Sequence, residues 1–291
     1  MPTNSLAEGQ ARDDDAGMPD DRSLELMHRH YELGLEEPRL EEALGSVEFA
    51  RTLEVADGVL PRPPAVVADI GGGPGRYALE LAERGYRVVH RDLVPLHVEQ
   101  LRTAVRDRAD GADRVETAVG DARDLDLDDD SVDAVLLLGP LYHLVERDER
   151  LRALQEVRRV ARPGAPVLVS AISRWAPRLH GHLAERLYER QAFFSELVRV
   201  VEESGRLNDD VPGWFTGYCH RPEQLREEVE AAGLAVEDLV GLEGLAFALG
   251  DLPERLADPA GRHVVLDCAR AIARVPELLG LSPHLLVVAR A

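Results

Sequence analysis

The sequence predicts an α/β protein built on a doubly wound, mainly parallel sheet of seven strands, with helices before it and a helical lid inserted into it. Two observations predict this fold class. Apolar, strand-like runs alternate with helical patterns, and the first of these runs ends in a glycine-rich bend that opens a helix. Such connections cross over in the right-handed sense, so the strands lie parallel and helices cover both faces. Ligands then bind at the carboxyl ends of the strands.

The elements follow in order along the chain. We expect residues 1–22 to be a disordered leader and residues 23–60 to form N-terminal helices. Residues 65–171 are predicted to form the ligand-binding core, and residues 172–219 a helical lid without a clear strand. Residues 220–291 are predicted to complete the core with a further helical insertion. The seven predicted strands are Ala65 to Ile70, Tyr86 to His90, Val115 to Val119, Asp133 to Leu138, Pro166 to Ser170, Leu234 to Leu242 and Leu285 to Ala289. The helices between them are predicted from about Tyr77 to Glu83, Pro95 to Arg108, Arg147 to Val160 and Pro222 to Ala232.

Composition excludes several classes of protein. The 291 residues carry 54 acidic and 34 basic side chains, and the resulting net charge of −20 argues against nucleic acid as substrate or partner. Every basic residue is arginine, so lysine Schiff-base chemistry and the lysine-containing phosphate loop are excluded. Two cysteines cannot build a disulfide framework, and no apolar run long enough to cross a membrane is present. We therefore expect a reduced, cytoplasmic protein.

The strongest local signal is VVADIGGGPGRY, residues 66–77, a strand that runs directly into glycines and then a helix. Glycines at this bend let a ligand approach the backbone, and the helix start offers unpaired N–H groups. A dinucleotide site is one reading, because Gly73, Gly75 and Ala78 satisfy GxGxxG/A and Asp92 lies 19 residues after Gly73, where a ribose-binding acid is expected.

Two further carboxylates favour a different ligand. Asp69 directly precedes the glycines, where its charge would oppose a diphosphate and attract an ammonium group. Asp121 follows the third strand and is expected at the same edge as Asp92. Three acids at successive strand ends suit a ligand with a cationic amine, a ribose and an adenine amino group.

These residues resemble those of the class I S-adenosylmethionine-dependent methyltransferases of the small-molecule type. The resemblance covers about Ala65 to Ser170, and it implies a Rossmann-like fold with S-adenosylmethionine as cofactor. It further implies that Asp69 and the glycine loop hold the methionine end, that Asp92 meets the ribose hydroxyls, that Asp121 and Ala122 meet the adenine, and that Gly139 lies beside the methyl group. Leu93 is a further expected cofactor contact. The residues carried over are Asp69, Gly71, Gly73, Gly75, Asp92, Leu93, Asp121, Ala122 and Gly139.

The end of the fourth strand, LLLGPLYHL, is where the resemblance places the transferred methyl group. His143 is a candidate base, since an unperturbed imidazole titrates near pH 6.5, and Tyr142 is a candidate for orienting the acceptor. Alternatively, Tyr142 packs over the cofactor and His143 caps the next helix. The sequence lacks the DPPY or NPPY pattern of enzymes that methylate nucleobases or glutamine, which again argues against a nucleic-acid target.

The predicted lid is the best clue to the acceptor. Seven of the 13 aromatic residues fall within 172–219, and such a lid would bury a flat or apolar acceptor and exclude water. Some of these rings can instead fill the core of the lid or the seam of a homodimer. The candidate substrate-binding residues are Tyr31, Trp175, His180, Trp214, Phe215 and Tyr218. His180 and His182 stand at i and i+2, a poor metal pair on a helix, so we predict no metal site.

The sequence thus predicts methyl transfer from S-adenosylmethionine to a small, aromatic or apolar organic acceptor. Oxygen is the preferred candidate for the methylated atom, followed by nitrogen or an activated carbon such as an indole position. The expected partner is that small molecule, with neither nucleic acid nor a membrane. Two rival functions stay open, an NAD(P)-dependent oxidoreductase on the same sheet and a cofactor-binding regulator without catalytic activity.

Overall fold

The computed structural model describes residues 42–108, 112–207 and 215–291. Within them, a seven-stranded sheet has the order β3-β2-β1-β4-β5-β9-β8. Its strands are β1 (Val66–Ile70), β2 (Arg87–Asp92), β3 (Val115–Val119), β4 (Ala134–Leu137), β5 (Pro166–Ile172), β8 (Ala235–Gly241) and β9 (His284–Arg290). The four pairs from β3 to β5 are parallel and the two pairs of β9, with β5 and β8, are antiparallel, so the predicted doubly wound, mainly parallel sheet of seven strands is confirmed.

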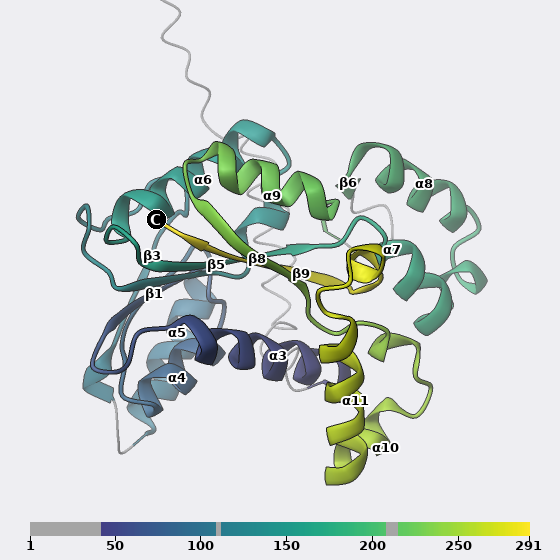
Figure 1. The fold of residues 1–291 in the computed structure, drawn as a ribbon, viewed down its shortest axis with the longest axis horizontal. Coiled ribbons are helices and arrows are strands. Elements are labelled where there is room, and N and C mark those ends of the chain that lie inside the picture. The colour runs from purple at the N-terminus through teal and green to yellow at the C-terminus, as the bar shows by residue number, and fades with distance from the viewer. Residues whose placement is uncertain (1–41, 109–111, 208–214) are drawn as a thin grey trace, which may run out of the picture.

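Helices cover both faces of the sheet (Figure 1). One face packs on α3 (Ala43–Val59), α4 (Arg76–Glu83) and α5 (Pro95–Arg106), and the other on α6 (Arg147–Val160) and α9 (Pro222–Ala231). A hydrophobic core lies on each face of the sheet, and successive residues of a strand point into opposite cores because side chains alternate across a pleated strand. In β1, for example, Val67 packs into one core and Ala68 into the other. The strand order reverses between β1 and β4, and a sheet of this kind binds its ligand at such a switch point.

The predicted strand boundaries are accurate to within two residues. β5 continues to Ile172 rather than ending at Ser170, because Ile172 pairs with His284 at the start of β9. Of the predicted N-terminal helices, the second is α3, whereas the first lies outside the described residues. The predicted leader, residues 1–22, also lies outside them.

The segment predicted as a helical lid contains α7 (Ala176–Leu179), a π-helix (His180–Ala184), a 3₁₀ helix (Leu187–Glu189) and α8 (Phe194–Ser204). It also contains two strands, β6 (Arg206–Leu207) and β7 (Gly217–Tyr218), which pair antiparallel. The prediction that 172–219 holds no strand is therefore wrong. Two residues are too few to show alternating hydrophobicity, so the pattern that reveals longer strands was missing here.

The remaining elements lie between β8 and β9. They are α10 (Leu252–Ala257), α11 (Pro259–Ile272) and 3₁₀ helices at Ala246–Ala248 and Pro276–Leu281, while two more 3₁₀ helices, Ala112–Arg114 and Pro140–His143, border β3 and β4. The side chains of α10 and α11 pack on the first turns of α3, beside the sheet (Figure 1). None of the helices in the described part of the chain combines the length and apolar character needed to cross a bilayer.

Candidate active site at the carboxyl edge of the sheet

The glycine loop after β1 is shaped by its contact with the loop after β4. Gly71, Gly73 and Gly75 have φ values of 65°, 57° and 84°, a region that disfavours residues with a Cβ. A Cβ at Gly71 would lie 2.3 Å from Pro140 Cγ, and one at Gly139 would lie 2.7 Å from the Gly71 carbonyl oxygen. Glycine at 71 and 139 therefore allows the two loops to touch at the switch point.

Asp69 lies beneath this loop and is completely buried. Among the described residues, neither of its carboxylate oxygens has a hydrogen-bond donor in bonding geometry. Burial, and next the charge of Asp92, raise the pKa of Asp69 from 3.8 to about 7, although the backbone N–H of Ala78 partly opposes this. A Cβ at Gly72 would lie 2.4 Å from Asp69 Oδ2, so the loop crosses directly over the carboxylate. A cationic ligand near this point would favour the ionised form.

Asp92, at the end of β2, ties the glycine loop to the second strand. Its Oδ2 accepts from the Gly73 N–H at 2.8 Å, and its Oδ1 accepts from the Val94 N–H at 2.8 Å and from His97 Nδ1 at 3.0 Å. Burial works to raise the pKa of Asp92, but the hydrogen bond from His97 and the other donors outweigh it, and the pKa is lowered. A carboxylate offers about four lone-pair sites, so about one stays open for a ligand.

His90 supports the loop from below, and sequence reasoning did not single it out. Its ring is fully buried, with Nε2 3.0 Å from the Gly73 carbonyl oxygen and Nδ1 2.9 Å from Thr117 Oγ1. Burial lowers the pKa of His90 to about 4, so the ring is neutral at pH 7. Because a carbonyl can only accept, Nε2 carries the proton and Nδ1 accepts from the threonine hydroxyl. The only signal in the sequence was a polar residue within an apolar strand.

Asp121 follows β3 at the same edge, as predicted, but its carboxylate is bound by Arg123 from within the chain. Arg123 Nη2 lies 2.7 Å from Asp121 Oδ2, and Arg123 also reaches Glu149 of α6. Burial would raise the pKa of Asp121, yet the hydrogen bonds from Arg123 lower it. Ala122 beside it is buried, and Leu93 is half-buried at the end of β2.

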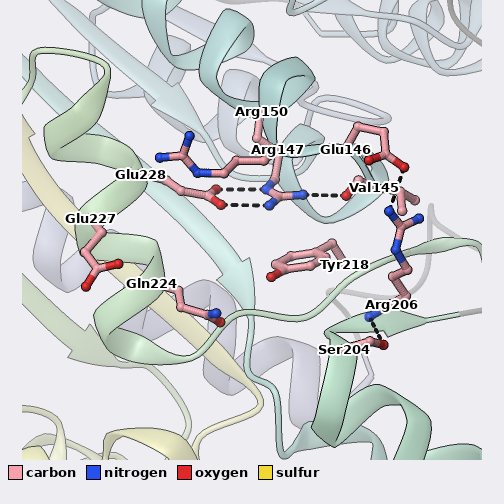
Figure 2. A pocket seen from close by; sticks show the side chains of 10 residues that line it. All are labelled: Val145, Glu146, Arg147, Arg150, Ser204, Arg206, Tyr218, Gln224, Glu227 and Glu228. Carbon is pink, nitrogen blue, oxygen red and sulfur yellow. Dashed lines mark hydrogen bonds and ion pairs between the residues drawn. The ribbon is translucent and has the colours of Figure 1, made fainter.

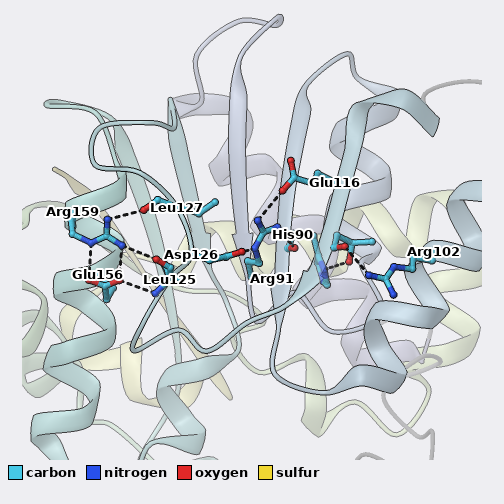
Figure 3. Close-up of polar contacts among 10 residues, drawn as sticks. His90, Arg91, Arg102, Glu116, Leu125, Asp126, Leu127, Glu156 and Arg159 are labelled. Carbon is cyan, nitrogen blue, oxygen red and sulfur yellow. Dashed lines mark hydrogen bonds and ion pairs between the residues drawn. The ribbon is translucent and has the colours of Figure 1, made fainter.

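An acidic run follows Asp121 in the loop between β3 and β4. The acidic side chains after Asp121 are exposed. Arg91 nevertheless binds Asp126 at 2.6 Å (Figure 3), and Arg159 binds Asp129 at 2.7 Å. These two arginines come from β2 and α6, on either side of the run. They hold the loop that carries Asp121 against the core.

Tyr142 and His143 lie in the 3₁₀ helix after β4, where they meet Phe215. The ring centroid of His143 is 4.7 Å from Tyr142 and 4.6 Å from Phe215. The Tyr142 hydroxyl lies 3.5 Å from the position that a Cβ would take at Gly139. The structure thus brings both catalytic candidates and one substrate candidate together beside the glycine loop.

The other substrate candidates contact different groups. Trp175, 38% exposed, lies 5.9 Å from the Arg221 guanidinium. His180 pairs with Glu185 at 3.0 Å and packs edge-on against Phe247. Tyr31 and Trp214 lie outside the described residues.

Tyr218 belongs to a buried ionic network that joins the lid to the core (Figure 2). Arg150 stacks 3.8 Å over its ring and binds Glu228 through two hydrogen bonds of 2.8 and 2.7 Å. Arg150 also donates to the carbonyl oxygens of Leu144 and Val145, so its guanidinium is committed to the protein. The polar cavity of about 280 Å³ beside it is lined by Val145, Glu146, Arg147, Arg150, Ser204, Arg206, Tyr218, Gln224, Glu227 and Glu228.

Sheet order and site together define an α/β protein with carboxylates at the β1–β4 switch point, the place where sheets of this kind bind their ligands. Residues 67–164 match the family described as a methyltransferase domain. The chain is 32% identical over 205 residues to a demethylmenaquinone methyltransferase of Clavibacter sepedonicus, covering 68% of this chain and 75% of that protein. It therefore belongs to the S-adenosylmethionine-dependent methyltransferases, whose cofactor is S-adenosylmethionine, and the resemblance noted from the motifs is confirmed.

Two further comparisons agree. An uncharacterized methyltransferase of Mycobacterium tuberculosis is 37% identical over 125 residues, 42% of this chain, and the chain spans about half, 47%, of that relative's length. A crystal structure of a methyltransferase from Methanosarcina mazei shares the fold with a TM-score of 0.56 and 20% identity, over 81% of this chain and 96% of that one.

Proposed function

We propose that this protein transfers the methyl group of S-adenosylmethionine to a small, aromatic or apolar organic acceptor. The observation that carries the proposal is Asp69, a fully buried carboxylate directly below the glycine loop that forms no ion pair with a cationic side chain of the described residues. A buried anion of this kind is compensated best by a cation, and S-adenosylmethionine brings an ammonium group and a sulfonium. A diphosphate would add negative charge beside it, which argues against an NAD(P)-dependent oxidoreductase.

The residues at the strand ends fit the cofactor in one orientation. The methionine end would lie over Gly71, Gly73 and Gly75, and the open acceptor site of Asp92 would take one ribose hydroxyl, with Leu93 alongside. Because Asp121 is engaged by Arg123, we propose that the adenine end meets Asp121 and Ala122 with Arg123 as a fixed neighbour. This orientation directs the sulfonium towards Gly139.

The acceptor would then lie against the cluster of Tyr142, His143 and Phe215. Methyl transfer is an in-line displacement, so these rings would act chiefly by orienting the acceptor and excluding water. For a hydroxyl acceptor, His143 would take the proton; an activated ring carbon needs a base only after the new bond forms. The name of the Clavibacter relative, which gives a quinone as that protein's acceptor, favours a flat ring system and puts carbon beside oxygen as the methylated atom.

Calorimetry with S-adenosylhomocysteine and with NAD(H) and NADP(H) tests the cofactor. We expect saturable binding of the former and no heat from the latter, and the reverse would overturn the proposal. Labelled-methyl turnover on phenols, indoles, amines and reduced quinones tests catalysis. Complete inactivity with intact cofactor binding would instead support a regulator that binds the cofactor without transferring its methyl group.

A further inference from the structure

The polar cavity of about 280 Å³ beside Tyr218 is separate from the glycine loop, and the proposed methyl transfer does not use it (Figure 2). Two helices begin at its edge, α6 at Arg147 and α9 at Pro222. The first turn of a helix has unpaired N–H groups and carries partial positive charge. The cavity is therefore bordered by two positive helix ends.

Arg174 lies behind the wall of this cavity and is only 2% exposed. Its Nη2 donates to Gln224 Oε1 at 2.8 Å and to the Tyr218 hydroxyl oxygen at 3.2 Å, and both of these residues line the cavity. Its Nε and Nη1 donate to the carbonyl oxygens of Cys219 and Glu202 at 2.7 and 3.2 Å. All four acceptors are uncharged, and no carboxylate of the described residues pairs with Arg174. Burial lowers the pKa of Arg174.

The ionised side chains that line the cavity balance one another. They are three arginines and three glutamates, namely Arg147, Arg150, Arg206, Glu146, Glu227 and Glu228. Arg150 pairs with Glu228, and Arg206 pairs with Glu146 at 2.8 Å. The exposed Arg147 and Glu227 add one charge of each sign. The charge of Arg174 is therefore not compensated within this network, and because such burial is costly, the site favours an added anion.

Two uncharged donors on the cavity wall can bind that anion. Gln224 Oε1 accepts from Arg174 and, at 3.3 Å, from the Arg221 N–H, which fixes the orientation of the amide. Its NH₂ group donates to no described residue, and neither does the hydroxyl of Tyr218 or the guanidinium of Arg147. Because Gln224 and Tyr218 bind the same nitrogen of Arg174, their donor groups lie close together (Figure 2).

We infer that this cavity binds a small organic carboxylate. The two carboxylate oxygens would accept from the Gln224 NH₂ group and the Tyr218 hydroxyl, with the Arg147 guanidinium as a further donor. A single negative charge balances that of Arg174. A phosphate dianion would bring a second negative charge close to the three glutamates of the cavity, which favours a carboxylate over a phosphate.

This carboxylate site and the proposed acceptor site are connected through β7. Tyr218 lines the cavity, and a Cβ at the preceding Gly217 would lie 2.3 Å from the Tyr142 carbonyl oxygen. Phe215 packs on His143, with ring centroids 4.6 Å apart. The two sites thus use different side chains of neighbouring segments.

Calorimetry on the full chain without cofactor is the direct test. Acetate, pyruvate and benzoate are titrated separately at pH 7 and constant ionic strength, with inorganic phosphate for comparison. At least one carboxylate should bind at one site per chain with a Kd of about 1 mM or tighter, and phosphate should bind more weakly. No binding of any carboxylate up to about 50 mM overturns the inference. Phosphate binding that is tighter than that of all three carboxylates refutes the ligand class.

A substitution that supplies the missing charge from within the chain locates the site. Gln224→Glu places a carboxylate against Arg174, so it should raise Tm and weaken carboxylate binding by about tenfold or more. Gln155→Glu, the same change on the exposed surface of α6, is the matched control and should bind as the wild type does. Equal binding by these two variants means that the anion binds elsewhere and refutes the site.

A second pair of variants changes only exposed residues, so both members should fold. Arg147→Gln removes the unpaired guanidinium at the cavity and should weaken carboxylate binding by about threefold or more. Arg152→Gln removes the same charge from an exposed position of α6 that does not line the cavity. Equal affinities in this pair also refute the site.

These measurements need neither cofactor nor turnover. The carboxylate site can therefore fail while the proposed methyl transfer stands, and the reverse is also true.

Discussion

Replacing Asp69 by asparagine should improve the stability of the protein and damage its binding site. The folded state keeps a proton on Asp69 up to about pH 7, whereas an unfolded chain releases it near 3.8. Between these pH values the folded state binds more protons, so this residue contributes a loss of stability as pH rises. Above pH 7 the full cost is at most about 4 kcal/mol, at about 1.4 kcal/mol per pKa unit. Asp69→Asn removes that cost, and its Tm without ligand should exceed that of the wild type at pH 8.

Cofactor binding should show the opposite dependence on pH. We expect the ammonium group of the ligand to require an ionised Asp69. At pH 5, two pH units below the pKa of about 7, only about one protein molecule in 100 carries this ionised form and can bind the ligand. The affinity for S-adenosylhomocysteine should therefore fall about 100-fold from pH 8 to pH 5, or about 2.7 kcal/mol.

Isothermal titration at constant ionic strength over this pH range measures the effect. Asp69→Asn should bind weakly with a much flatter profile, and Asp128→Asn, which neutralises an exposed carboxylate of the acidic loop, should follow the wild type. A wild-type affinity that does not change between pH 5 and 8 would refute the reasoning, as would tight binding by Asp69→Asn.

Three further predictions concern the loops and the network below the lid. Glu228→Gln leaves the charge of Arg150 buried without its carboxylate partner and should cost about 3–5 kcal/mol in urea unfolding at pH 7. Burial raises the pKa of Glu228, but the hydrogen bonds from Arg150 and His220 outweigh it and lower the pKa from 4.5 to about 2. The difference in unfolding free energy between variant and wild type should therefore shrink as pH falls from 4.5 towards 2. Gly71→Ala combines about 1–2 kcal/mol of strain from the left-handed backbone with steric overlap against the loop after β4, so it should lower both Tm and the affinity for S-adenosylhomocysteine. Gly164→Ala, at φ 77° in open space, should show the backbone strain alone. Equal losses of Tm in the two variants would contradict this account. His143→Ala should reduce turnover of a hydroxyl acceptor while leaving the Kd of S-adenosylhomocysteine within about twofold; full activity would remove His143 from the role of base.

Much of the fold could be read from local patterns. The run before Gly71 is apolar and short, the proline at position 95 opens a helix, and the glycines mark a bend, so strands and helices were predicted within a few residues. Each of these signals arises from neighbours in the chain. β6 and β7 escaped detection because two-residue strands exist only through their pairing with each other.

The candidate site divides in the same way. Asp69 and Asp92 were found because residues at strand ends share an edge in any parallel sheet. His90, Arg123 and Arg150 were missed, because their roles depend on partners that the sequence places far away, such as Thr117 for His90. The cluster of Glu48, Glu243 and His284 left no signal in the sequence, since its three residues come from separate elements that meet only in the folded chain.

By itself, the sequence determined the doubly wound sheet, the glycine loop and the acids at its strand ends, because these depend on hydrophobic periodicity and on which residues tolerate a tight bend. Only the tertiary structure decided which of those acids keeps an open acceptor site. It buried Asp69 beneath the glycine loop, engaged Asp121 with Arg123, and brought Glu48 to His284. Burial and charge at those positions are properties of packing between distant segments, and no local pattern encodes them.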